Sequence, residues 1–173
     1  MVFAAVVVFA SSQPGCAWAQ ARSRPVTIQQ SKAEPDEPED LDLETIRERL
    51  LALHNKVREE EKLKSLEVSP KLQEAAQKHA DEMAETGELT HEGKDGSKPA
   101  DRIKAEGYRY RRCGENIAYG PTTPKEVMEG WLDSPPHKKN ILGSFTQIGM
   151  GHAKSKDGTP YWCVTFGFPA PAR

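Results

Sequence analysis

The chain has 173 residues, of which 36% are hydrophobic and 29% are charged, and its formal net charge is -2. This length and composition are typical of one soluble globular domain with additional terminal segments. The charge balance offers no excess of basic residues to neutralise a phosphate backbone, so nucleic acid is not expected as a partner.

Residues 1–21 indicate an export signal. Residues 2–10 form an apolar run that is too short to span a bilayer as a helix, and the small residues at 17–21 offer cleavage sites. The basic start that such signals usually carry is missing. A second interpretation is a lipoprotein anchored through Cys16, although the residues before it resemble a lipobox poorly. We expect a secreted, periplasmic or cell-envelope protein with no transmembrane segment.

Residues 22–44 predict an acidic disordered linker. They contain three prolines and a run of acidic residues between Glu34 and Asp42, with almost nothing to bury. A spacer is favoured over an acidic interaction tail. The folded domain is expected from residue 45 onwards.

Two amphipathic helices are predicted at the start of the domain. Apolar residues recur at every third or fourth position through 44–57, opposite a charged face. A second helix is expected from Ser69-Pro70 to Gly87, which are typical helix boundaries. His79 lies on the apolar stripe of this helix, and we interpret it as a buried structural residue rather than a ligand.

Shorter helices and a hairpin complete the predicted domain. Proline-initiated helices are expected near 99–106 and 124–132, the second one stopped by Pro135-Pro136. The β-rich runs 145–153 and 161–166 flank an Asp-Gly pair that is typical of a hairpin turn. Glycines in the first of these runs indicate a bulge or the close approach of another backbone. The best candidate for an earlier strand is 117–119.

The tripeptide Gly114-Glu115-Asn116 is the most informative motif of the chain. His91 precedes it in a loop after the second predicted helix, and His137 follows it at a predicted helix break. Two imidazoles and a carboxylate beside turn residues can converge in one polar cleft.

This arrangement resembles the CAP superfamily of cysteine-rich secretory proteins, antigen 5 and plant pathogenesis-related 1 proteins, in its bacterial form. The resemblance covers residues 45–169. It implies an α+β fold, namely an α-β-α sandwich with a small central antiparallel sheet, as a single domain. Helices on both sides of a small sheet would also bury the apolar stripes described above.

Family members line a cleft with two histidines and two acidic residues. His91 matches the first histidine, and Glu115 matches the acid of the Gly-Glu-Asn motif. Ser134 and Ser144 stand where animal and plant members carry the second acid and the second histidine. Bacterial relatives resemble this chain in a Ser-Pro-x-His segment, so His137 is expected to supply the second imidazole.

His91 and His137 are therefore candidate ligands for Zn²⁺ or another divalent cation, which neutral imidazoles bind well. Glu115 would ligate the ion or polarise a bound water. The alternative is a cleft without metal, in which Glu115 fixes the tautomer of His91. No motif such as Gly-x-Ser-x-Gly surrounds Ser134, so a serine nucleophile has no support.

The resemblance favours a non-catalytic, monomeric extracellular module that binds a lipid, sterol, glycan or protein. The alternative is a metal-dependent hydrolase of peptides or envelope components, with Glu115 as its general base. An open metal coordination position would favour the enzyme, and a closed or metal-free cleft would favour the binding module.

The cysteines predict one disulfide. Removal of the export signal would leave Cys113 and Cys163 as the only two thiols of an exported protein, and we expect them to pair. Two free buried cysteines are the alternative, because a sequence does not show their geometry.

Overall fold

The computed structural model describes residues 6–10 and 41–171. Most of the predicted export signal and nearly all of the predicted linker lie outside these residues. The first helix, α1 (Leu43–Glu60), begins two positions before the expected domain boundary. Its start is fixed by Asp42, whose side chain accepts a hydrogen bond from the backbone N–H of Thr45 at 2.9 Å.

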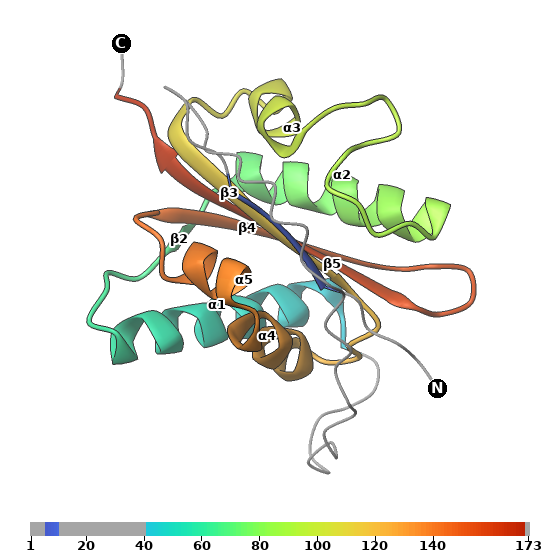
Figure 1. Ribbon diagram of the computed structural model, residues 1–173, viewed down its shortest axis with the longest axis horizontal. Coiled ribbons are helices and arrows are strands. Elements are labelled where there is room, and N and C mark those ends of the chain that lie inside the picture. The colour runs from blue at the N-terminus through green and yellow to red at the C-terminus, as the bar shows by residue number, and fades with distance from the viewer. Residues whose placement is uncertain (1–5, 11–40, 172–173) are drawn as a thin grey trace.

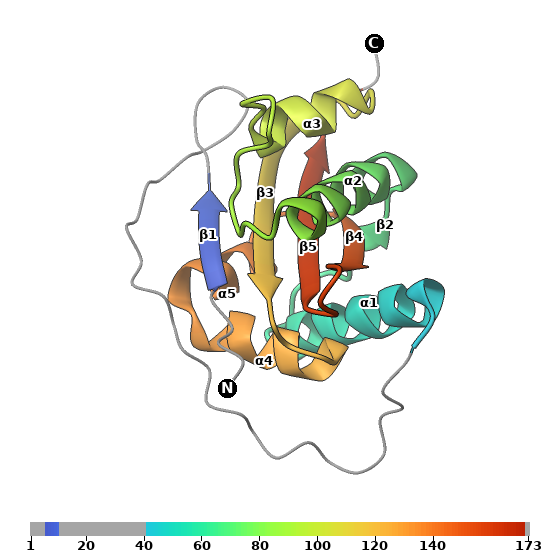
Figure 2. The same ribbon diagram turned by 90° about the vertical axis from the view of Figure 1, so that its right-hand side faces the viewer.

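A sheet of five strands forms the middle layer of the part that the structure describes (Figure 2). Its order is β1 (Val6–Ala10), β3 (Tyr110–Tyr119), β5 (Pro160–Pro169), β4 (Gln147–Lys154) and β2 (Glu67–Val68). All neighbouring pairs are antiparallel except β2 and β4, which are parallel. The predicted α+β sandwich is confirmed, with a sheet that is mixed at its β2 edge.

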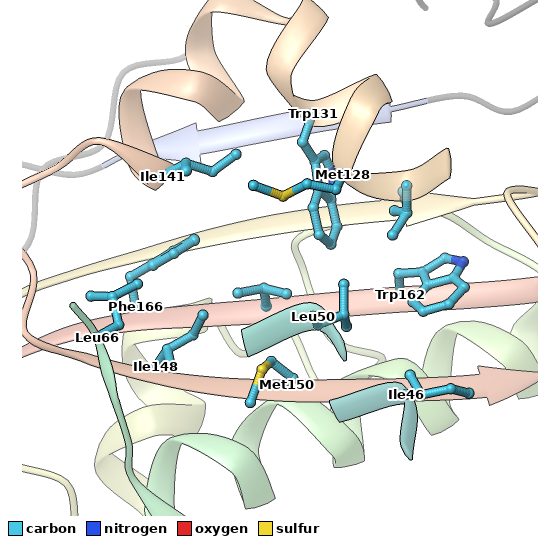
Figure 3. Packing of buried hydrophobic residues seen from close by; sticks show 13 residues of the cluster. Ile46, Leu50, Leu66, Met128, Trp131, Ile141, Ile148, Met150, Trp162 and Phe166 are labelled. Carbon is cyan, nitrogen blue, oxygen red and sulfur yellow. The ribbon is translucent and has the colours of Figure 1, made fainter. Parts of the chain in front are cut away.

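One face of the sheet is covered by α1, α4 (Pro124–Asp133) and α5 (Pro135–Ile141), as Figure 1 shows. Trp131 of α4, Leu50 of α1 and Phe166 of β5 are fully buried in the apolar cluster between them (Figure 3). Pro135-Pro136 was expected only to stop a helix. These prolines instead begin α5, because the first turn of a helix does not need their missing N–H groups.

The opposite face carries α2 (Pro70–Thr86) and α3 (Pro99–Ala105). The helix α2 lies directly against β4. A Cβ atom at Gly149 would overlap the carbonyl carbon of Leu72, and one at Gly151 would overlap the carbonyl oxygen of Ala76. The two glycines therefore allow the backbones of helix and strand to touch, which confirms the predicted close approach.

The strand β3 is much longer than the expected segment 117–119. It begins at Tyr110 and pairs with β5 along its length, with an irregular register between Tyr110 and Arg112. The Gly114-Glu115-Asn116 motif consequently lies inside the strand, in its buried part. This placement decides where its side chains project.

Candidate functional site

Consecutive side chains of a strand point to opposite faces of a sheet, and the motif in β3 follows this rule. The Glu115 carboxylate is 2.8 Å from Nδ1 of His91, in the loop between α2 and α3. The Asn116 side chain instead contacts α5, where its Nδ2 donates to the carbonyl of His137 and its Oδ1 accepts from Asn140. The motif therefore reaches both helical layers.

Glu115 is the centre of a buried polar network. Only 1% of its surface is exposed. Nη2 of Arg102, on α3, donates to Oε1 at 3.1 Å and to Oε2 at 2.9 Å. The thiol of Cys163 lies 3.5 Å from Oε2, and Nε2 of His79 lies 4.0 Å from Oε1. Both carboxylate oxygens are thus already engaged by donors from the protein.

The network holds Glu115 in its ionised form. Burial is the largest single influence on its carboxyl and acts to raise the pKa, but the charge of Arg102 and the smaller contributions of the neighbouring histidines together outweigh it. His79 and the hydrogen bond from His91 act in the same direction as Arg102, and the pKa falls to about 2. Burial lowers the pKa of His79, which favours its neutral form. At neutral pH the site is therefore a carboxylate held by a guanidinium and an imidazole.

Arg102 also fixes the loop that carries His91. Its Nη1 donates to the carbonyl oxygens of His91 and Ser97, both at 3.0 Å. One guanidinium therefore joins α3, the loop and β3. Because an ionised carboxylate can only accept, Nδ1 of His91 is the donor of this hydrogen bond and carries a proton. The geometry selects one tautomer and one orientation of the imidazole.

His137 is placed differently from the expectation. It is fully buried inside α5 rather than at a helix break, and its carbonyl accepts from Asn116 at 3.3 Å. The contacts of His137 and His91 with the motif thus lie on opposite faces of β3. The structure joins His91 to Glu115, whereas the approach of His137 to them stays a prediction.

The two serines lie at turns. Ser134 is buried between α4 and α5, and its backbone N–H donates to the carbonyl of Trp131. Ser144 is exposed in the turn before β4. No hydrogen bond within residues 41–171 links either side chain to Glu115 or His91.

Sequence reasoning missed Arg102 and Asn140. Arg102 lies in a short helix and belongs to no recognisable sequence motif. Only its position in the fold shows that it pairs with Glu115. Asn140 donates to the carbonyl of Glu115 at 3.1 Å. The interpretation of His79 as a satisfied core residue is confirmed: it is fully buried, with Nε2 2.8 Å from the carbonyl of Thr90.

The side chains around His91 are not suited to a zinc site with four protein ligands. Within residues 41–171 and the short β1 segment, no group of three histidine, cysteine or acidic side chains could hold a metal ion. The oxygens of Glu115 are taken by Arg102 and His91. A cation at this place would bind through Nε2 of His91 and depend on ligands from elsewhere.

The expected disulfide between Cys113 and Cys163 is wrong. Cys163 is a buried free thiol, so it does not pair with Cys113. In the register of β3 and β5, Cys163 stands opposite Ile117 and Cys113 opposite Gly167. Four positions along a strand separate the two cysteines by roughly 13 Å, well beyond the spacing of about 4–7 Å that a disulfide spans.

A pocket of about 410 Å³ opens beside the network, between the C-terminal half of α2 and the following loop. Its lining includes His79, Met83 and the acidic residues Glu82, Glu88 and Glu92. One lining residue, His79, has its Nε2 4.0 Å from Oε1 of Glu115, whereas Glu115 and His91 are not in the lining. The predicted cleft residues Ser134, Ser144 and His137 are not part of this lining.

Comparison with known proteins identifies the class. The sequence model of the Cysteine-rich secretory protein family, also called CAP, matches residues 51–166. The chain belongs to this family, which confirms the resemblance of its motifs. It is 35% identical over 108 residues to the uncharacterized protein YkwD of Bacillus subtilis, covering 62% of this chain and 42% of YkwD. The chain thus spans less than half of this relative.

Solved structures agree with the fold. An outer surface protein from Borrelia burgdorferi superposes with a TM-score of 0.68 at 25% identity, over 75% of this chain and 97% of that one. An extracellular SCP-domain protein from Bacillus anthracis gives a TM-score of 0.66 at 22% identity, over 83% and 46%. In the described part of this chain, no helix has the length and apolarity needed to cross a membrane.

Proposed function

We propose that this chain is an exported binding module that recognises a lipid, sterol, glycan or protein outside the cytoplasm, with His91 at its recognition site. The observation that carries the proposal is the engagement of Glu115 by Arg102 and His91. This network orients an imidazole and leaves no carboxylate oxygen to do chemistry. The extracellular SCP-domain neighbour supports the export.

The same observation weakens the hydrolase alternative. A general base works best with a pKa near the operating pH, and it must reach the proton that it removes. The pKa of Glu115 is about 2, and the residue is almost fully buried. Its role in the proposed module is therefore to position the imidazole of His91.

The proposed export would change the edge of β3 that carries Glu115. His91 is only 5% exposed, and β1 pairs with β3 so that Phe9 stands opposite Glu115. Residues 6–10 fall within the predicted export signal. Removal of that segment would uncover the edge of β3 at 114–118 and the part of α5 that β1 contacts. The exported form is thus the form proposed to bind.

A divalent cation held by His91 and His137 is the second candidate. Metal-ligating histidines commonly donate their other N–H to a carboxylate, and His91 has this arrangement with Glu115. Metal analysis of exported protein, purified without chelators or a histidine tag, tests it. Binding that disappears in His91→Ala and weakens as pH falls through the histidine range would support it, because a protonated imidazole cannot ligate.

The proposed module is tested by NMR on the exported protein. Palmitate, cholesterol, chitotriose and a mixed peptide library are titrated separately while the His91 imidazole resonances are followed. The resonances of His54, buried in the other helical layer, serve as an internal reference. We expect one probe class to shift His91 alone, and His91→Gln to abolish its binding. Turnover of peptides that is lost in the same variant would instead favour the hydrolase.

A further inference from the structure

The residues around the start of β3 form a basic patch that the net charge of the chain conceals. Four of its members are exposed cations, and two aromatic rings lie among them: Lys104, Arg109, Arg111, Arg112, Tyr110 and Phe168. The only acidic residue between positions 104 and 112 is Glu106, which pairs with Lys78 at 2.9 Å. A chain of net charge -2 thus carries a local concentration of positive charge.

The strand geometry gathers these side chains. Tyr110 pairs with Pro169 and Arg112 with Phe168, so Arg111 is an extra residue at an irregularity of the ladder. Arg112 lies over the ring of Phe168 at 6.0 Å, and Nζ of Lys104 lies over Tyr110 at 5.8 Å. The rings thus position Lys104 and Arg112, and Arg109 and Arg111 follow in the same short segment at one end of the sheet.

The four cations have no acidic partners among the residues that the structure describes. In the described part of the chain, no ion pair joins Lys104, Arg109, Arg111 or Arg112 to a carboxylate. The segment 109–112 is about 10 Å long, similar to the Debye length of about 8 Å at physiological ionic strength. The charges are therefore close enough to act jointly at physiological ionic strength.

We propose that this basic patch binds an acidic polysaccharide that carries a carboxylate or phosphate on each repeat. A single exposed ion pair contributes little, so an open patch without a pocket needs a partner that makes several contacts at once. A linear polyanion provides them, and the planar guanidinium groups suit carboxylate and phosphate oxygens.

The surroundings of the patch favour such a polymer over a membrane. The exposed large hydrophobic residues of the described chain are Leu63 and Val68, which lie near β2. The rings of Tyr110 and Phe168 are only partly exposed and lie beneath cations, so the patch offers no apolar group for insertion into a bilayer. The proposed export favours an extracellular polymer over a nucleic acid.

The test measures binding of the full chain to immobilised polygalacturonate, with dextran as the neutral polymer. The patch variant is Arg109→Glu/Arg111→Glu/Arg112→Glu. The matched control, Lys64→Glu/Lys138→Glu/Lys139→Glu, makes the same charge change at exposed lysines elsewhere. We expect the patch variant to lose at least about tenfold in affinity and the control to lose much less. Raising the salt from about 0.1 M to about 1 M should abolish binding, because the Debye length falls from about 10 to about 3 Å.

Equal losses in both variants would overturn the proposal, because only the net charge would then matter. Tighter binding to phosphatidylglycerol vesicles or to duplex DNA than to polygalacturonate would also overturn it. Thermal unfolding of each variant checks the fold, and triple Arg→Gln and Lys→Gln versions replace the charge reversals if these unfold. If the patch variant loses polymer binding while ligands still shift the NMR resonances of His91, the basic patch is distinct from the proposed recognition site.

Discussion

Replacing Glu115 by glutamine tests the buried network most directly. Glu115→Gln keeps the shape of the side chain and removes its charge. Arg102, whose side chain is only 10% exposed, would then lie beside a neutral amide, and His91 would lose the carboxylate that fixes its tautomer. A buried cation without its counter-charge is costly.

The magnitude follows from the pKa of Glu115. Its fall from 4.5 to about 2 corresponds to roughly 3 kcal/mol of preference for the ionised form in the folded protein. Loss of one partner of a buried ion pair typically costs about 3–5 kcal/mol. We therefore expect Glu115→Gln to lower the free energy of unfolding by about 3 kcal/mol at neutral pH.

The effect has a defined pH dependence. Because the folded-state pKa of Glu115 is lowered, its contribution to stability is present above pH 4.5 and is lost as pH falls towards 2. Urea unfolding of the wild type and of Glu115→Gln across this range should give two curves that converge at low pH. Glu48→Gln, at an exposed position of α1, is the matched control. A variant as stable as the wild type at neutral pH would refute the assignment of Glu115 as the ionised centre.

Three further results are expected. Gly149→Ala should lower the free energy of unfolding by about 1–3 kcal/mol, measured by urea denaturation, because its Cβ would overlap the backbone of α2. The Cys163 thiol should resist alkylation in the native protein and react in denaturant without reductant; a thiol inaccessible in both states would contradict the structure. Burial lowers the pKa of His54 to about 4, so its NMR titration should occur there, with stability falling as pH drops from 6.5 towards 4.

The helices and the final hairpin could be predicted because local signals determine them. Apolar residues at helical spacing, Ser69-Pro70, Gly87 and the Asp157-Gly158 turn all lie in the chain near the elements that they define. The start of β3 gave no such signal. Its residues 111–116 are mostly charged, polar or glycine, and their burial depends on partners from other elements.

The candidate site was predictable only in part for the same reason. The link between His91 and Glu115 was found through the family resemblance, and the structure shows their hydrogen bond. Arg102 lies 13 residues from Glu115 in the sequence, and Asn140 lies 25 residues from it. No spacing pattern predicts either contact. The place of His137 was misjudged because two prolines were taken only as a helix stop and not as the start of α5.

The opposite directions of Glu115 and Asn116 also constrain how the sheet assembles. A slip of β3 by one residue against β5 would turn the carboxylate towards α5 and the amide towards α3. Arg102 would then lose its counter-charge, and Asn140 would meet a buried anion in place of an amide. A mispaired sheet would thus lose polar contacts to both helical layers at once. Two neighbouring residues therefore favour the correct strand alignment during folding.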